Sequence, residues 1–159
     1  MVAPLLIIAI GNESRGDDAL APQLLRRLQV TPEKIELLED FQLQVEHAMD
    51  LLGRKLVLFV DAGMNMRAPY RFYRTGPDAE HMLFSHALAP AAVLATYVRV
   101  YGNEPPPAYV LCIGGAQFEL GSPLSASGQQ HLELASQFLQ LLLQEATAAA
   151  WDARAHAPD

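Results

Sequence analysis

The chain has 159 residues, of which 51% are hydrophobic and 18% charged, and its formal net charge is −7. This length and composition predict a single globular domain with a proper core and exclude an intrinsically disordered chain. The acidic balance argues against nucleic-acid binding and against anchoring to an anionic membrane, because both need a basic face.

Short apolar runs alternate along the chain with segments of helical spacing. We expect strands at 5–10, 34–40, 55–63 and 108–115, of which the first and last are buried, and a half-exposed edge strand at 70–75, where aromatic and polar residues alternate. The expected helices lie at about 17–29, 43–53, 90–100 and 124–147. Ser125 or Ser127 is the expected N-cap of the last helix, and the alanine-rich residues 148–159 predict a flexible tail after a domain of residues 1–147.

Strands that alternate with helices predict a three-layer α/β sandwich, in which a mostly parallel sheet has helices on both faces. The functional crevice of such a sheet lies beyond the carboxyl ends of its strands. Three loops leave these ends, at 11–17, 61–69 and 115–124. We therefore expect Asp18 and Asp61 to face one crevice.

Adjacent aspartates, Asp17 and Asp18, follow the first strand, and Asp61 follows the strand at 55–63. Aspartate at a helix N-terminus commonly caps free N–H groups. Because neighbouring side chains on a helix point about 100° apart, we expect one of the pair to cap and the other to face the crevice. Asp61 could be a turn residue that bonds its own backbone, but a carboxylate at this position of an open α/β sheet is more often functional.

Nucleotide binding and thiol chemistry are two alternatives that the residues disfavour. A dinucleotide fingerprint needs three closely spaced glycines, and a Walker loop needs Gly-Lys-Ser/Thr, whereas the first loop has only Gly11 and Gly16 among several acids. Cys112 lies within an apolar strand, where an inert core thiol is expected. Because Cys112 is the single cysteine and no signal peptide or bilayer-spanning stretch is visible, we expect a cytoplasmic protein.

His86 is the histidine best placed beside the crevice, because it directly precedes the helix expected at Pro90. Asp18, Asp61 and His86 together would offer two carboxylates and one imidazole, a mixed set suited to a divalent transition metal. Three protein ligands leave coordination positions open for substrate or water. The sequence therefore predicts a cation site in which these three residues are both ligands and catalytic residues.

Four segments resemble the hydrogenase maturation endopeptidases, which process the large subunit of NiFe hydrogenases. In chain order they are IAIGNESRGDDALAP, LVLFVDAG, SHALAP and CIGGAQFELGSPLSA. The resemblance implies a five-stranded sheet between helices. It also implies a nickel-sensing set made of an acid in the first loop, an aspartate after the central strand and a histidine, which fall on Asp18, Asp61 and His86.

The resemblance further implies an activity and a partner. The protein would clip a C-terminal extension from a NiFe hydrogenase large-subunit precursor after nickel has been loaded. The nickel would be supplied by the precursor, with no permanent metal in the protease, which we expect to be a monomer. The alternative is a non-catalytic nickel-binding chaperone or checkpoint protein that holds the loaded precursor without cutting it.

Overall fold

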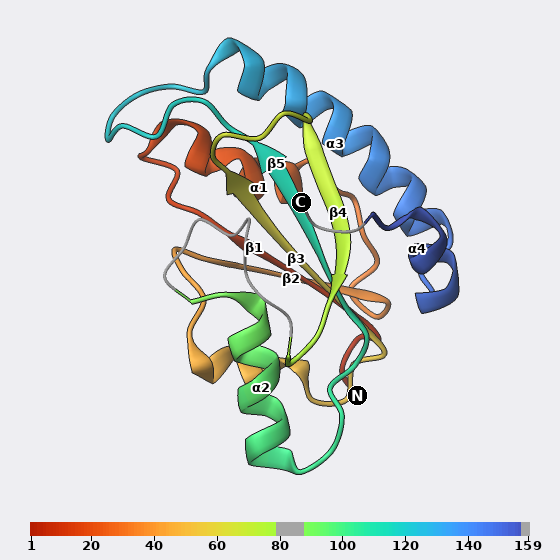
Figure 1. Cartoon of the computed structure of the whole chain (residues 1–159). Coiled ribbons are helices and arrows are strands. Elements are labelled where there is room, and N and C mark those ends of the chain that lie inside the picture. Colours follow the sequence, from red (N-terminus) through yellow and green to blue (C-terminus); the bar gives the residue numbers. More distant parts are fainter. Residues whose placement is uncertain (79–87, 157–159) are drawn as a thin grey trace.

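The sheet is the organising element of the fold in the computed structural model, which describes residues 1–78 and 88–156 (Figure 1). Its five strands are β1 (Leu5–Ile10), β2 (Ile35–Asp40), β3 (Leu56–Gly63), β4 (Tyr70–Thr75) and β5 (Ala108–Gly114). Their order is β2-β1-β3-β5-β4, with β4 antiparallel to β5 and every other neighbouring pair parallel. The mostly parallel sheet and the edge strand at 70–75 are thus confirmed.

The three central strands are buried on both faces. Every residue of β1, β3 and β5 is buried, whereas most of β2 and β4, at the two edges, is only partly buried. Continuous apolar runs such as LLIIAI and LVLFV are typical of strands covered by helices on both sides, so the sequence already specifies which strands are central.

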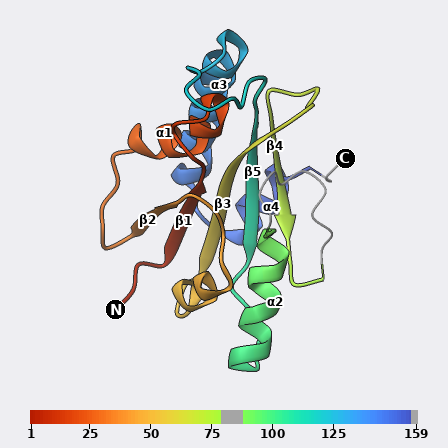
Figure 2. The same cartoon turned by 90° about the vertical axis from the view of Figure 1, so that its left-hand side faces the viewer.

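Helices cover the two faces of the sheet as separate groups (Figures 1 and 2). One face carries α1 (Leu20–Arg26), α3 (Ala126–Gln144) and α4 (Ala148–Arg154), and the other carries η2 (Val45–Leu51) and α2 (Pro90–Tyr101). Successive side chains of a strand point to opposite faces. On β3, Leu58 and Val60 therefore pack on the α1/α3 side, and Val57 and Phe59 on the α2 side. The three-layer sandwich is confirmed.

Two of the expected α-helices are partly or wholly 3-10 helices in the structure. The helix expected at 17–29 starts as a 3-10 turn, η1 (Gly16–Ala19), and becomes α-helical only at Leu20. The N–H of Asp17 donates to the carbonyl of Gln117 in another loop (2.7 Å), and this tertiary bond accompanies the tighter first turn. The segment expected as a helix at 43–53 is the short 3-10 helix η2.

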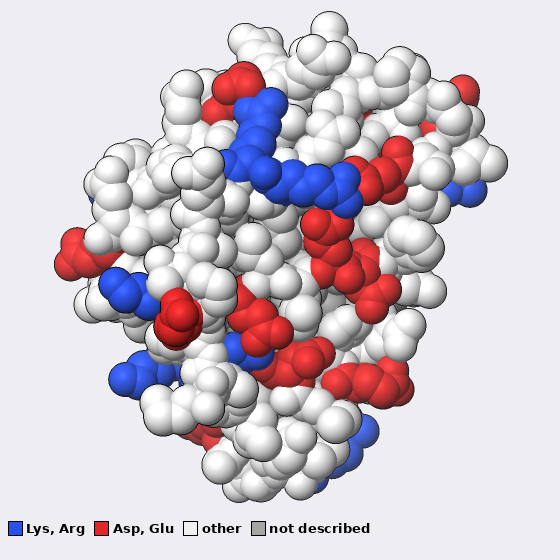
Figure 3. Space-filling model, turned by 180° about the vertical axis from the view of Figure 1, so that it is seen from behind, with Lys and Arg blue, Asp and Glu red and all other residues white. Residues whose placement is uncertain are grey.

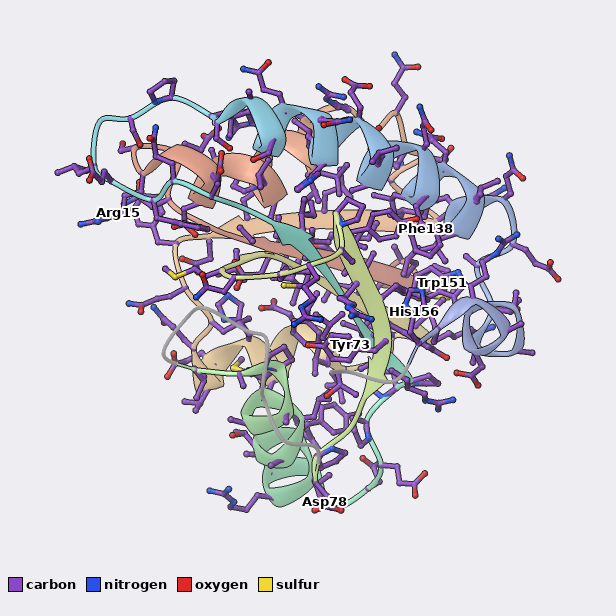
Figure 4. All side chains as sticks on the ribbon, turned by 45° about the horizontal axis from the view of Figure 1, so that its top comes forward. Arg15, Tyr73, Asp78, Phe138, Trp151 and His156 are labelled. Carbon is purple, nitrogen blue, oxygen red and sulfur yellow. The ribbon has the colours of Figure 1, made fainter. Side chains whose placement is uncertain are left out.

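The expectation of a flexible tail is wrong for residues 148–156. Residues 148–154 form α4, and Trp151 is fully buried with its indole N–H donating to the carbonyl of Leu142 (2.9 Å). The indole packs edge-on against Phe72, beside Phe138 of α3 (Figure 4). One large aromatic side chain is enough to dock an otherwise alanine-rich segment. The core therefore extends past the boundary expected at residue 147.

The surface carries the acidic balance that the composition indicates. Figure 3 shows acidic side chains gathered on the face seen from behind. Arg26 forms ion pairs with Glu13 and Glu39, so Glu13, to which the sequence assigns no role, belongs to a surface ion-pair network. Within the described ranges, no helix is long and apolar enough to span a membrane.

Candidate functional site

The carboxyl ends of β1, β3 and β5 lie at the same end of the sheet, which we call the carboxyl edge. Loops 11–16 and 115–125 lie side by side there (Figure 1). A cavity of ≈ 340 Å³ opens here between residues 64–66, which follow β3, and residues 115–118, which follow β5. A larger hollow of ≈ 500 Å³ lies where β4 ends and β5 begins, at the opposite end of the sheet. We take the smaller cavity as the candidate site, because ligands of open α/β sheets bind at the carboxyl ends.

Asp61 is fully buried near the end of β3, and its Oδ1 accepts a hydrogen bond from the N–H of Ala62 (2.8 Å). By strand alternation it projects to the α2 side, with Val57 and Phe59. It pairs across the sheet with Cys112. The hydrogen bond to the next N–H is the one expected if Asp61 is only a turn residue. Complete burial of a carboxylate is costly, however, and a turn does not need it.

Cys112 and Tyr73 lie near Asp61 on the same side of the sheet (Figure 4 labels Tyr73). Burial raises the pKa of the Cys112 thiol, and the charge of Asp61 raises it further. Burial likewise raises the pKa of the Tyr73 phenol, followed by the effects of Cys112 and Asp61. Both groups therefore stay neutral near neutral pH. The Cys112 sulfur lies 3.6 Å from that of Met66, which fits the predicted inert core thiol.

Asp18 lies in η1 and is almost fully buried, with 8% of its surface exposed. Its Oδ2 accepts a hydrogen bond from the N–H of Asn12 (2.8 Å), so the carboxylate holds the loop that leaves β1. Gly11 packs against the backbone of Asp18, and a Cβ at position 11 would collide with the carbonyl oxygen of Asp18. Glycine at position 11 is therefore required for the close approach of this loop to η1.

Asp17 is fully buried, and its carboxylate points toward loop 115–125. Its Oδ2 accepts from the N–H groups of Ala116 (2.7 Å) and Gln117 (3.2 Å) and from the Ser125 hydroxyl (2.6 Å), and its Oδ1 accepts from the Ser125 N–H (2.8 Å). Burial alone would raise the pKa of this carboxyl, but the four hydrogen bonds outweigh burial and the pKa is lowered.

The prediction that one of the two aspartates caps its own helix is wrong. The N-cap residues of η1 and α1 are Arg15 and Ala19, and neither makes a side-chain capping hydrogen bond. Asp17 instead binds donors from a distant part of the chain, which local pattern cannot reveal. The predicted N-cap Ser125 is confirmed, because its side chain accepts from the N–H of Gly128 (2.9 Å).

Asp61 lies near the end of β3, and Asp18 lies in η1, which follows the neighbouring strand β1 at the same edge of the sheet. Neither is among the described residues that line the cavity of ≈ 340 Å³. His86 lies outside the described residues, so the convergence of Asp18, Asp61 and His86 stays a prediction. Among the residues that the structure describes, no group of three or more His, Cys, Asp or Glu side chains is arranged to hold a metal ion. Sequence reasoning missed Tyr73 as a neighbour of Asp61, although alternation in an edge strand beside β5 is a signal that could have placed it.

Comparison with known proteins finds similar folds but no similar sequence family. No protein-family model matches the sequence, and no curated protein matches it. The three-layer fold is, however, similar to that of solved hydrogenase maturation endopeptidases.

Three solved structures illustrate this likeness. The hydrogenase maturating endopeptidase HybD from E. coli matches with a TM-score of 0.72 and 21% identity, over 92% of this chain and 94% of its own. The NiFe hydrogenase maturation protease HycI from Thermococcus kodakarensis KOD1 has a TM-score of 0.65 and 20% identity, over 90% and 94%. HybD from Thermococcus kodakarensis has a TM-score of 0.66 and 17% identity, over 89% and 99%.

Proposed function

We propose that this protein is an endopeptidase that removes the C-terminal extension of a nickel-loaded NiFe hydrogenase large-subunit precursor, as a monomer in the cytoplasm. The observation that carries the proposal is the match of its fold to the E. coli endopeptidase HybD over 92% of the chain. The burial of Asp18 and Asp61 at the carboxyl edge supports it, because this edge is where α/β sheets bind their ligands.

Asp18, Asp61 and His86 would bind the nickel that the precursor carries on its own cysteines. A carboxylate removed from water attracts a cation more strongly than an exposed one, because the surroundings screen its charge less. Asp61 is fully buried, so water screens its charge less than that of a surface carboxylate. A site completed only by the precursor's nickel would restrict cleavage to the loaded form.

Nickel docking would fix the scissile peptide in register with the site. Positioning of this kind can lower a reaction barrier by about 7 kcal/mol or more. Two routes to cleavage are compatible with these residues. The metal could polarise the carbonyl as a Lewis acid, or a carboxylate could activate the attacking water.

The proposal is tested by mixing the purified protein with nickel-loaded and nickel-free precursor and following the mass of the large subunit. Loss of a C-terminal peptide from the loaded form alone is the expected result. Tight binding of the loaded precursor with unchanged mass would overturn the protease and favour the chaperone alternative. Cleavage of both forms would overturn the role of nickel.

Asp61→Asn tests the role of the buried carboxylate in the same assay. The variant keeps the size of the side chain but removes the charge, so we expect a folded protein that no longer processes the loaded precursor. Asp50→Asn, on the helix η2 away from the carboxyl edge, is the matched control and should process normally. Normal processing by Asp61→Asn would contradict the proposed ligand role.

A further inference from the structure

We infer that Asp17 is a positioning residue, whose carboxylate fastens loop 115–125 to η1 and thereby fixes the orientation of Asp18. The catalytic consequence of this inference rests on the proposed function, whereas its structural consequence can be measured without any activity. Asp17 itself lies outside the predicted nickel set.

The hydrogen bonds of Asp17 join three parts of the chain. The carboxylate belongs to η1, after β1, while Ala116 and Gln117 follow β5 and Ser125 begins α3. The Ser125 hydroxyl donates to Asp17 and accepts from the N–H of Gly128, so the connection continues into the first turn of α3. A single side chain thus links the loops that leave two different strands.

Backbone hydrogen bonds flank the carboxylate on both sides. The N–H of Gly16 donates to the carbonyl of Ser122 (3.1 Å), and the N–H of Gly121 donates to the carbonyl of Ser14 (2.6 Å). The N–H of Asp17 itself donates to Gln117 (2.7 Å). The two loops are therefore paired by their main chains, and Asp17 occupies the interior of that pairing.

Two glycines leave the space that the Asp17 side chain fills. A Cβ at Gly115 would lie 2.8 Å from the Cβ of Asp17, and one at Gly128 would lie 2.5 Å from its Oδ1. Both approaches are closer than any other residue type would permit without a shift. A carboxylate that served only to solvate the surface would need no such fit.

The charge of Asp17 is held by oriented donors. Within the described residues, no lysine, arginine or histidine forms an ion pair with it, and its partners are three backbone N–H groups and one hydroxyl. N–H donors on a folded main chain are directional, unlike a mobile lysine side chain. Because Asp18 is the next residue, the position of η1 against loop 115–125 determines where its carboxylate points.

Amide hydrogen exchange on Asp17→Asn measures this arrangement directly. The change replaces one carboxylate oxygen by an NH₂ group of nearly the same size, so that a donor faces N–H donors. We expect the amides of Ala116, Gln117 and Ser125 to lose protection by at least about tenfold. The Asn12 amide should lose protection as well, because it reports the position of the Asp18 carboxylate.

Two further variants keep this test decisive. Gly128→Ala retains the Asp17 carboxylate but crowds it, so it should affect the same four amides even if Asp17→Asn does not fold. Asp152→Asn, a carboxylate in α4 that also accepts hydrogen bonds across the chain, should leave these amides unchanged. Unchanged protection at Ala116, Gln117 and Ser125 would overturn the fastening role, and unchanged protection at Asn12 alone would overturn the positioning of Asp18.

Kinetics with the nickel-loaded precursor then separate positioning from substrate binding. Asp17 is fully buried and bound to loop 115–125, so Asp17→Asn should lower kcat by at least about tenfold while KM changes by less than about threefold. A wild-type kcat in a variant with exposed loop amides would overturn the positioning role. If the wild-type protein cuts nothing, the proposed function fails, and the exchange measurements still decide the role of Asp17.

Discussion

The carboxyl edge of the sheet and the C-terminal segment are each tied to the fold by an aspartate, but the two ties differ. Asp17 is fully buried and accepts mainly from backbone N–H groups. Asp152 is half-exposed and accepts from the Tyr109 hydroxyl (2.6 Å) and the Arg74 guanidinium (2.8 Å). Figure 4 shows Arg15, in the loop before η1, at the left of the molecule and well separated from His156, which follows α4.

The difference shows which forces fix each region. At the carboxyl edge, polar bonds in a buried setting define the geometry, because an unsatisfied buried carboxylate is strongly penalised. At the C-terminal segment, burial of Trp151 anchors α4, and the polar contacts lie at its rim. Substitutions in the first region should therefore alter geometry and function, and those in the second should alter stability.

Trp151→Ala should have the largest effect on stability. The indole is fully buried and packs against Phe72 and Tyr109, so its removal leaves a cavity under α4. We expect the free energy of unfolding to fall by about 3–5 kcal/mol, measured by urea denaturation. Cleavage per folded molecule should stay near the wild-type value. A loss below about 1 kcal/mol, within the range of surface substitutions, would show that α4 is not anchored by its tryptophan.

Acid should weaken the carboxyl edge through Asp17. Its pKa is lowered in the folded protein from the ordinary value of 3.8, so its contribution to stability is complete above that value and is lost as the pH falls through the folded-state pKa. Asp17→Asn should therefore cost about 1.5–3 kcal/mol near pH 7 and clearly less near pH 2. Urea denaturation of both proteins at several pH values measures this difference. An equal cost at both pH values would contradict the role of the charge.

The fold was largely predictable because its central strands are continuous apolar runs in the sequence. The apolar runs at 5–10, 55–63 and 108–115 could be read as buried parallel strands, and each agrees with the structure to within a residue or so. The α4 helix was not predictable, because alanine-rich composition gives no direction to its packing. A single tryptophan docks it against residues that lie far away in the sequence.

The site was predictable only as far as strand ends can be located. Parallel topology places the segments that carry Asp18 and Asp61 at one edge, whereas their facing one crevice with His86 stays a prediction. Asp17 was expected to cap its own helix but instead links two loops, because its hydrogen-bond donors lie about 100 residues away in the sequence. Only the three-dimensional pairing of loops 11–16 and 115–125 reveals this link, because no local spacing encodes it.

The smallest effect is expected at Asp152, the exposed counterpart of Asp17. Asp152→Ala removes the acceptor for Tyr109 and Arg74 at the rim of α4 but leaves the buried Trp151 in place. Exposed ion pairs contribute little, because water and salt screen them, so we expect Tm to fall by no more than about 2 °C. The shift, measured by thermal denaturation at low and high salt, should shrink further as salt is added. A salt-independent loss as large as that of Trp151→Ala would mean that polar contacts anchor both regions alike.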